Sequence, residues 1–352
     1  MLRFNVRLSS FLLLFIVCTL LSACGDSPLV RQESFVFGTR VEIVSYGTPA
    51  PQAREALAET LREFDRMHHA YHAWQPSQLT TLNAHIAAGQ STTVSAELID
   101  LLRISGRYSE LSEGLFEPAI GGLIAAWGFQ ADQFVARLPP EKDITRLVAA
   151  KPRSTDLEFN GLQVRSANPA VQFDFGGLVK GYALDRAAQI LHRHGVNNAL
   201  INIGGNVMAL GKKGDVPWQV GIQSPRSAAP LATLALYDGE AIGTSGDYQR
   251  FFELNGKRYS HLIDPRTGRP SEAAQAVTIL ITPQATGHTQ AGTLSDLTSK
   301  PIFLAGVDWP RMARKLNVSY VLRVDPHGAI QVTPAMRARL RWADGVVASD
   351  VK

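Results

Sequence analysis

The feature that most narrows the fold is a change of pattern near the middle of the chain. In the first half, apolar residues recur at helical spacing from Pro51 to about His69 and again from Ala96 to Leu111, and a shorter apolar stretch covers Ile144–Ala149. From residue 171 onward, short strand-like runs separated by Gly, Pro and Asn-Gly turns prevail. We therefore expect an α+β fold with largely antiparallel sheets and flanking helices.

The second half also predicts individual elements. Strands are expected at Phe35–Ser45, Val171–Phe175, Ala199–Ile203, Trp218–Ile222, Leu231–Tyr237, Phe251–Leu254 and Val277–Ile281. A helix is expected from about Tyr182 to His194, ended by Gly195, and the arginine-rich segment Met336–Trp342 is interpreted as a surface helix. No repeat or linker divides the chain after residue 35, so we predict one compact domain over 35–345.

The N-terminus has the form of an export signal. Arg3 and Arg7 precede an apolar run, Phe11–Leu21, that is too short to cross a bilayer as a stable helix. The run ends in Leu-Ser-Ala before Cys24, which resembles a bacterial lipobox, so we predict a signal peptide over 1–23 and lipidation at Cys24. Residues 24–34 would then be the lipidated N-terminus and linker. An ordinary signal peptide with a chance cysteine is the alternative.

Composition excludes several kinds of chemistry. The only two cysteines of the chain are Cys18 and Cys24, so the body after the signal has no thiol for a disulfide, a nucleophile or a zinc–thiolate site. The formal net charge of +4 is spread along the chain, which is weak support for nucleic-acid binding, and we expect no nucleic-acid partner.

Three polar, glycine-containing blocks are candidate functional segments. In Phe173–Asp185, a strand pattern runs into a glycine pair and then opens a helix that carries Lys180. Glycines allow a ligand to approach the backbone, and the N–H groups at a helix start can hold a phosphate. The spacing matches neither Gly-x-Gly-x-x-Gly nor a P-loop, so a plain strand-to-helix turn explains it equally well.

The second and third blocks follow later in the chain. Ala241–Tyr248 gathers glycines and hydroxyls, and we interpret it as a phosphate-contacting loop that contains Thr244. Tyr259–Pro270 places His261 three residues before Asp264 in a Pro/Gly loop. Loops of this kind often carry acid–base residues, and a simple turn is the alternative.

Together these blocks resemble the ApbE family of FAD:protein FMN transferases. Further matches extend the resemblance from residue 37 to about residue 306: Phe37-Gly38-Thr39, Asp65–Asn83, Gly114–Glu117 leading to Trp127–Phe129, Asn202–Asn206 and Trp218–Ile222. The resemblance implies one T-fold-like catalytic domain. Members of the family are commonly exported lipoproteins, which agrees with the independent prediction for Cys24.

The resemblance also implies roles for individual residues. Flavin contacts would come from Phe37, Trp74, the backbone of Leu115, Phe116 and Glu117, Asp174, Lys180 and Ile263. Thr244 joins them as a phosphate contact because of the second block's own pattern and not because of the resemblance. Trp74 would stack on the flavin ring system, a gain of about 1 kcal/mol beyond area burial. A Mg²⁺ ion would be held by the backbone oxygen of Gly177 and the side chain of Asp296.

The sequence departs from the family pattern at this metal position. Lys300 stands where a threonine ligand is usual, in the run Asp296-Leu-Thr-Ser-Lys300-Pro. An ammonium group cannot ligate a cation, so either Ser299 or Thr298 replaces the ligand, or Lys300 partly replaces the charge of the metal. We take Ser299 as the predicted third ligand. Smaller departures are Trp74, where the family often has tyrosine, and Glu117, where aspartate is usual.

A zinc site at His68 and His72 is an alternative for the end of the first helix. The two residues are four apart on one helix face, but they lack the glutamate that accompanies such a pair in metalloproteases. We therefore disfavour this interpretation.

The resemblance implies the following reaction. A threonine or serine hydroxyl of an acceptor protein attacks the FMN-side phosphorus of FAD and expels AMP, with Mg²⁺ neutralising charge on the pyrophosphate. His261 is the candidate base, with Asp264 as its catalytic companion. The expected acceptors are exported flavin-carrying subunits of membrane redox complexes, and the expected location is the periplasmic face of a membrane. Alternatives are an FAD pyrophosphatase that uses water, and a non-catalytic FAD-binding lipoprotein.

Overall fold

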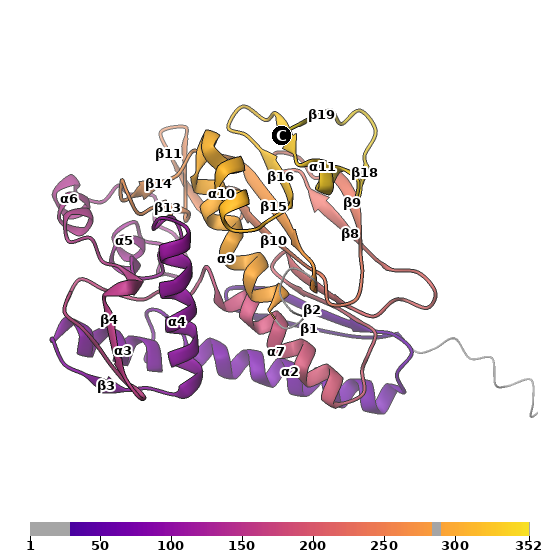
Figure 1. Cartoon of the computed structure of the whole chain (residues 1–352), viewed down its shortest axis with the longest axis horizontal. Helices are drawn as coiled ribbons and strands as arrows, with labels where there is room; N and C mark the ends of the chain where they lie inside the picture. The colour runs from indigo at the N-terminus through magenta and orange to yellow at the C-terminus, as the bar shows by residue number, and fades with distance from the viewer. Residues whose placement is uncertain (1–28, 284–289, 352) are drawn as a thin grey trace, which may run out of the picture.

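A nine-stranded sheet forms the centre of the molecule. The computed structural model describes residues 29–283 and 290–351, so Cys24 and the predicted signal peptide lie outside the described residues. The strand order is β1-β2-β6-β7-β10-β15-β16-β17-β19 (Figure 1), and every neighbouring pair is antiparallel except β17 and β19. The strands are β1 (Val30–Val36), β2 (Thr39–Ser45), β6 (Ala199–Ile203), β7 (Asn206–Leu210), β10 (Ala241–Gly246), β15 (Ala276–Ile281), β16 (Tyr320–Val324), β17 (Ile330–Val332) and β19 (Ala348–Asp350).

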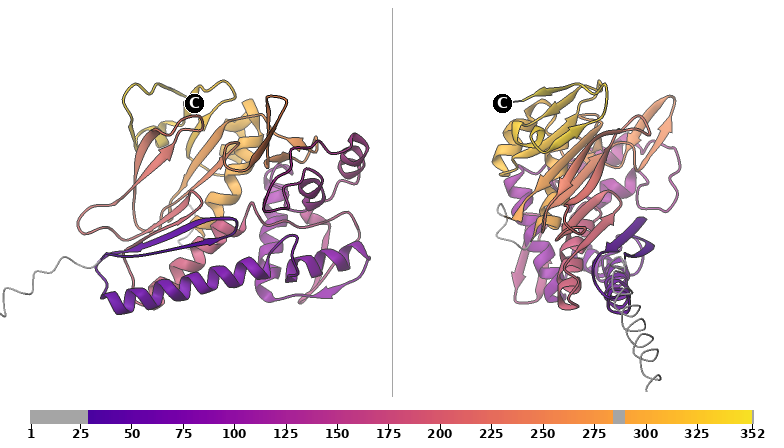
Figure 2. Two further views of the ribbon diagram at one scale, coloured as in Figure 1. Left: turned by 180° about the vertical axis from the view of Figure 1, so that it is seen from behind. Right: turned by 90° about the vertical axis from the view of Figure 1, so that its right-hand side faces the viewer.

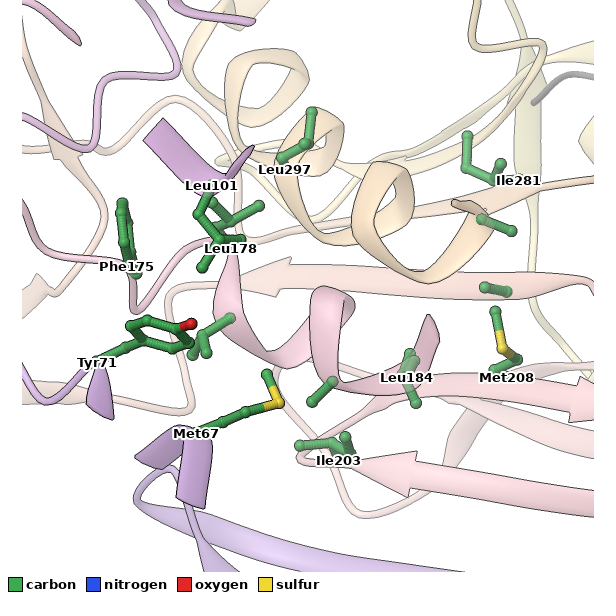
Figure 3. Packing of buried hydrophobic residues seen from close by; sticks show 14 of the residues in the cluster. Met67, Tyr71, Leu101, Phe175, Leu178, Leu184, Ile203, Met208, Ile281 and Leu297 are labelled. Atoms are coloured by element: carbon green, nitrogen blue, oxygen red, sulfur yellow. The ribbon is translucent and has the colours of Figure 1, made fainter. Parts of the chain in front are cut away.

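Both faces of this sheet are covered. Helices α7 (Val179–Arg193) and α9 (Ala291–Leu304) pack on one face, and the long helix α2 (Ala50–Ala70) lies against α7 and β1 (Figure 1). Figure 3 shows side chains of these helices, including Leu184 and Leu297, beside strand residues such as Met208 and Ile281. A three-stranded antiparallel sheet of β8 (Trp218–Gln223), β9 (Pro230–Leu236) and β18 (Leu340–Trp342) packs on the other face through a second apolar cluster.

Smaller elements extend the molecule at one end. Helices α3 (Gln78–Ala87) and α4 (Ala96–Leu111) lie beside a sheet of β3 (Thr92–Thr93), β5 (Gln163–Ser166) and β4 (Leu157–Asn160) (Figures 1 and 2). A third apolar cluster joins α5 (Gly121–Ala126) and α6 (Glu141–Ala149) to the hairpins β11 (Phe251–Leu254)–β12 (Lys257–Ser260) and β13 (Ile263–Asp264)–β14 (Arg269–Pro270). The remaining elements are the 3₁₀ turns η2 (Ser154–Asp156) and η3 (Gly306–Asp308) and the helices α10 (Trp309–Lys315) and α11 (Pro334–Arg337).

The predicted fold class is confirmed: this is a single α+β domain with mostly antiparallel sheets. Helix α4 and strands β6 and β11 have the predicted bounds, and α2 extends one residue beyond its prediction at each end. Gly195 follows α7 with a φ of 70°, as expected of a residue that ends a helix. Helical and strand periodicity located these elements because each has one clearly buried face.

Four predictions about elements are wrong. Phe35–Ser45 is not one strand but part of the hairpin β1–β2, which turns at Phe37 and Gly38 with φ values of 57° and 68°. Val171–Phe175 has an isolated bridge from Gln172 to Ile120 in place of a strand. The expected loop Ala241–Tyr248 contains the central strand β10, and Met336–Trp342 divides into the end of α11 and strand β18.

Helix α9 was not predicted at all. Twelve of its 14 residues are buried, so it has no polar face and no amphipathic period, and it contains Pro301. A helix that is enclosed on all sides gives the sequence pattern of a loop or a short strand.

Candidate active site

A cleft of about 1130 Å³ opens where the β1–β2 turn, the end of α2, the start of α7 and strand β10 meet. All nine residues predicted to contact the flavin or its phosphates line this one cleft: Phe37, Trp74, Leu115, Phe116, Glu117, Asp174, Lys180, Thr244 and Ile263. They come from segments far apart in the sequence. Typical small-molecule sites have volumes of about 300 to 1,000 Å³, so a cleft of this size suits a large ligand such as a dinucleotide.

Aromatic and imidazole rings form one wall of the cleft. The ring of Phe37 lies 5.9 Å from that of His68, and the rings of His72 and Trp74 are 4.3 Å apart, measured between centroids. Trp74 is 37% exposed, so its face is available to a flat ligand. Nδ1 of His72 accepts the backbone N–H groups of Trp74 and Gln75, at 3.3 and 3.1 Å, which fixes the ring beside the tryptophan.

The histidines of this wall are held neutral. Burial lowers the pKa values of His68 and His72 below the ordinary histidine value, and each is further disfavoured as a cation by a neighbouring imidazole. Among the described residues, no group of three His, Cys, Asp or Glu side chains is placed to hold a metal ion.

The segment Leu115–Glu117 lines the cleft, and the carboxyl group of Glu117 is buried in the protein. It accepts hydrogen bonds from the hydroxyl of Ser109 (2.5 Å), the amides of Ser154 (2.8 Å) and Ala119 (3.1 Å), and the hydroxyl of Ser154. Burial raises the pKa of Glu117 despite these donors. The hydrogen bonds of the Glu117 carboxyl group therefore anchor this segment beside the cleft.

Asp174 lines the cleft from the glycine-containing segment that precedes α7. One carboxylate oxygen accepts the amide of Gly176 at 2.9 Å, and the other accepts the side-chain amide of Gln130 at 2.9 Å. These bonds orient the carboxylate and shape the glycine turn that begins the helix. The sequence did not single out Gln130, whose contact with Asp174 spans 44 residues.

Helices α7 and α9 cross at their first turns, and each caps the other. Asp185 on α7 accepts the amides of Gly292 (2.9 Å) and Thr293 (2.8 Å) at the start of α9. Asp296 on α9 accepts the amide of Gly181 (2.9 Å) at the start of α7. Both carboxylates thus bind N–H groups that lack partners within their own helix.

The crossing requires glycine at the point of contact. A Cβ atom at position 181 would lie 2.4 Å from the backbone oxygen of Gly292, and one at 292 would lie 2.6 Å from that of Gly181. No side chain fits at either position. The close approach places Asp296 beside Lys180 and Lys300, which line the cleft.

Two lysines converge on Asp296. Lys300 donates to the Asp296 carboxylate and, at 2.7 Å, to the Asp296 backbone oxygen, and Nζ of Lys180 lies 3.8 Å from the second carboxylate oxygen. Burial acts to raise the pKa of Asp296, but the two ammonium groups outweigh it and hold the pKa below the ordinary value. Burial lowers the pKa of Lys300 to about 8, against the opposing pull of the carboxylate.

The predicted magnesium ligands do not form an open set of donors. Both oxygens of the Asp296 carboxylate already accept hydrogen bonds, one from Lys300 and one from Gly181. The hydroxyl of Ser299 donates to the Asp296 carbonyl at 2.8 Å and lies 2.8 Å from the hydroxyl of Ser245, and Ser299 is fully buried. Gly177 lines the cleft, but the side chain of Lys300 crosses directly over it. The residues present therefore do not fit the predicted Mg²⁺ site.

His261 also lines the cleft, and its ring centroid lies 6.4 Å from that of Phe129. Its Nδ1 is 3.1 Å from the backbone oxygen of Arg250, so Nδ1–H donates there and Nε2 carries the free lone pair. Burial, followed by the charges of Arg250 and Lys180, lowers the pKa of His261 to about 3. The imidazole is therefore neutral near pH 7 and is available as a proton acceptor.

Asp264 and Ile263 have different surroundings although they are neighbours. Ile263 lines the cleft, whereas the carboxylate of Asp264 accepts the backbone N–H of Arg266 at 2.9 Å and pairs with the Arg266 guanidinium at 2.7 Å. These bonds make Asp264 the anchor of the β13–β14 turn. Thr244 lines the cleft from β10, where its hydroxyl is 2.9 Å from that of Thr278.

Arg250 is a cleft residue that the sequence analysis missed. Its guanidinium lies 5.2 Å from the centroid of the Phe134 ring and donates to the backbone oxygen of Phe129 at 3.1 Å. Burial lowers its pKa, although Asp174 and Asp132 oppose this. The contacts that bury Arg250 span more than 100 residues of sequence, so no local signal distinguishes it from a surface arginine.

Fold and site together define the class of protein: a single-domain α+β protein whose cleft has an aromatic wall suited to a ring system and two lysines, Lys180 and Lys300, suited to phosphates. The chain belongs to the ApbE family, which it matches over residues 37–322. None of the helices in the described ranges is both long and apolar enough to cross a membrane.

Relatives and solved structures agree with this assignment. The FAD:protein FMN transferase of Rhodobacter capsulatus is 42% identical over 322 residues, which is 91% of this chain but 60% of that protein. The enzyme of the same name from Treponema pallidum is 31% identical, covering 77% of this chain and 80% of its own length. The crystal structure of the ApbE protein of Thermotoga maritima has 30% identity and a TM-score of 0.79, and covers 89% of this chain and all of that one.

Proposed function

We propose that this chain is an FAD:protein FMN transferase: it moves the FMN half of FAD to a threonine or serine hydroxyl of an acceptor protein and releases AMP. Membership of the ApbE family and the names of the relatives in Rhodobacter capsulatus and Treponema pallidum support the activity. The observation that carries the proposal is the convergence of all nine predicted flavin-contact residues on one cleft of dinucleotide size.

In this proposal the flavin lies along the aromatic wall and the pyrophosphate lies over the start of α7. Trp74 offers a stacking surface, and the glycine turn before Lys180 brings backbone N–H groups and an ammonium to the phosphates. The acceptor oxygen forms a bond to the FMN-side phosphorus while the bond from that phosphorus to the bridging oxygen breaks. AMP departs with the bridging oxygen and its electron pair.

His261 is the proposed base for the acceptor hydroxyl. The neutral ring, with Nδ1–H fixed on the carbonyl of Arg250, has its Nε2 lone pair free to take the proton. A group with a pKa of about 3 is a weak base in the free protein, but the negative charge of a bound pyrophosphate would stabilise the imidazolium. Asp264, tied to Arg266, would act by holding the turn and not by touching the substrate.

Membrane attachment and location are part of the proposal. The lipobox-like run before Cys24 supports a lipid anchor and an enzyme that faces the periplasm. Exported flavin-carrying subunits of membrane redox complexes are the proposed acceptors. The magnesium dependence predicted from the sequence stays a prediction, and the hydrogen bonds that occupy Asp296 argue against the predicted ligand set.

Mass spectrometry of a candidate acceptor after incubation with the purified protein and FAD tests the transferase directly. Transfer gives an acceptor that carries FMN at a threonine or serine, together with AMP. Free FMN and AMP with an unmodified acceptor would instead indicate a pyrophosphatase, and intact FAD bound to the protein would indicate a binding lipoprotein. His261→Ala is expected to lower the transfer rate by about 100-fold or more, and an unchanged rate would remove His261 as the base.

A further inference from the structure

Lys300 occupies the space in which a cation would have to lie to contact Asp296 and Gly177. Its ammonium donates to the carboxylate and to the backbone oxygen of Asp296. A Cβ atom at position 177 would lie 2.9 Å from Cε and 3.2 Å from Cδ of Lys300, so the lysine stem rests on the glycine turn. Lys300 also lines the cleft.

The cluster of Lys180, Asp296 and Lys300 carries a net positive charge. It contains two ammonium groups and one carboxylate, and Asp296 is only 1% exposed. A buried carboxylate paired with one lysine would be neutral overall, whereas the second lysine adds one uncompensated charge at the cleft. A dianionic pyrophosphate is the part of FAD that such a charge would attract.

Both ammonium groups retain donors for a ligand. Each lysine has three N–H groups. Lys300 uses two of them, on the carboxylate and the carbonyl of Asp296, and Lys180 uses one on the carbonyl of Gly176 at 3.0 Å. Since both residues line the cleft, the remaining N–H groups can reach phosphate oxygens there.

The alternative, a divalent cation at Asp296, would have to displace this arrangement. It would compete with Lys300 for one carboxylate oxygen and with the Gly181 amide for the other, next to an ammonium that repels it. The other candidate side-chain ligands are also engaged. Ser299 is fully buried and bonded to the Asp296 carbonyl and to Ser245, and the buried hydroxyl of Thr298 donates to the Leu294 carbonyl at 2.7 Å.

From these contacts we infer that Lys300, together with Lys180, binds the FAD pyrophosphate in place of a divalent cation at Asp296. Lys300 neutralises the charge that develops on the departing AMP phosphate as the phosphorus–oxygen bond breaks. The proposal for the reaction step rests on the proposed transferase function, whereas the proposal for pyrophosphate binding does not.

Ligand binding to the full-length protein in EDTA tests this inference independently of transfer. Riboflavin shares the ring system of FAD but has no phosphate, so comparing the two isolates the pyrophosphate. We expect Lys300→Met to weaken FAD binding by at least 10-fold and to change riboflavin binding by less than 2-fold. The matched control, Lys315→Met, alters a lysine paired with Glu113 on the surface and should change neither.

The second experiment titrates MgCl₂, without FAD, into the protein and measures the heat of binding by calorimetry. We expect no saturable heat from the wild type, and saturable binding to Lys300→Thr, in which the ammonium is gone and a hydroxyl is present. Wild-type FAD binding that requires Mg²⁺, or an equal loss of FAD and riboflavin binding in Lys300→Met, would overturn the inference. Thermal unfolding of each variant shows whether a loss of FAD binding comes from misfolding. The Mg²⁺ titration and the FAD-binding measurement on the wild-type protein test the inference without any variant.

If no acceptor is ever flavinylated although FAD binds as described, the transferase proposal fails and the binding proposal stands. If flavinylation occurs but only with Mg²⁺, the transferase proposal stands and the role of Lys300 is wrong.

Discussion

The two carboxylates at the crossing of α7 and α9 have the same task and opposite surroundings. Asp185 and Asp296 each accept N–H groups at the start of the other helix. Asp185 has only neutral donors around it, and burial raises its pKa to about 6. Asp296 is buried as deeply, yet the ammonium groups of Lys180 and Lys300 hold its pKa below the ordinary value.

This difference shows how a carboxylate that caps a helix can also take part in a ligand-binding site. Reciprocal capping and the contact between Gly181 and Gly292 hold the two helices together. Neither interaction requires a charged side chain at the cleft. The two lysines at the Asp296 end add a fixed, positively charged group at the place where α7 begins. The Asp185 end then serves as an internal control for the same capping geometry without the lysines.

Asp296→Asn should give the largest effect. Its amide oxygen can still accept the Gly181 N–H, but the two lysines lose their counter-charge, and breaking a buried pair costs about 3 kcal/mol or more. Urea unfolding measures the change. Glu113→Gln, which alters an exposed pair with Arg311 and Lys315, is the control and should leave unfolding unchanged. A loss no larger in Asp296→Asn than in this control would show that the charges at Asp296 are not coupled to folding.

Gly181→Ala tests the close contact between α7 and α9, which lies between the Asp185 cap and the Asp296 cap. The new Cβ would lie 2.5 Å from the Cβ of Asp296 and closer still to the Gly292 carbonyl, so we expect a loss of about 2 to 3 kcal/mol in urea unfolding. Gly106→Ala on α4 is the control, because its Cβ would have ordinary contacts of 3.4 Å and alanine favours a helix. Equal stability of the two variants would contradict the close crossing.

Asp185 and Asp296 should contribute to the pH dependence of the free energy of unfolding with opposite signs. The folded-state pKa of Asp185 is raised from 3.8 to about 6, so its contribution is full below pH 3.8 and is lost as the pH rises through about 6. That loss is on the order of 2 to 3 kcal/mol and should be absent in Asp185→Asn. The folded-state pKa of Asp296 is lowered, so its contribution is full above the ordinary aspartate pKa and is lost on acidification. Identical pH profiles for wild type and Asp185→Asn between pH 4 and about 7 would refute the assignment to Asp185.

Thr293→Val should give the smallest effect. It removes one hydroxyl donor, 2.5 Å from the Asp185 carboxylate, and leaves the two amide donors in place. We expect a loss of about 1 kcal/mol in urea unfolding and no change in FAD binding. A change in FAD affinity would mean that the hydrogen bonds of Asp185 are coupled to the lysine cluster at Asp296.

Sequence reasoning located the elements with one buried face and the residues of the cleft, but not the arrangement at Asp296. Eight of the nine predicted contact residues followed from the family resemblance and Thr244 from its glycine- and hydroxyl-rich block, and all nine line one cleft. Helix α9 was missed because it is buried on nearly every side, and β10 was taken for a loop because its glycines and hydroxyls resemble one. The partners of Asp264, Ser299 and Arg250 depend on how the chain folds back, which no local pattern reports.

The most direct test of a lysine-held pyrophosphate is the initial rate of acceptor flavinylation by the wild-type protein in EDTA and in excess MgCl₂. A protein that transfers FMN with its own lysines at the pyrophosphate should show rates within about 2-fold of each other, a difference of less than about 0.5 kcal/mol in the barrier. A rate that collapses in EDTA and returns with Mg²⁺ would contradict it.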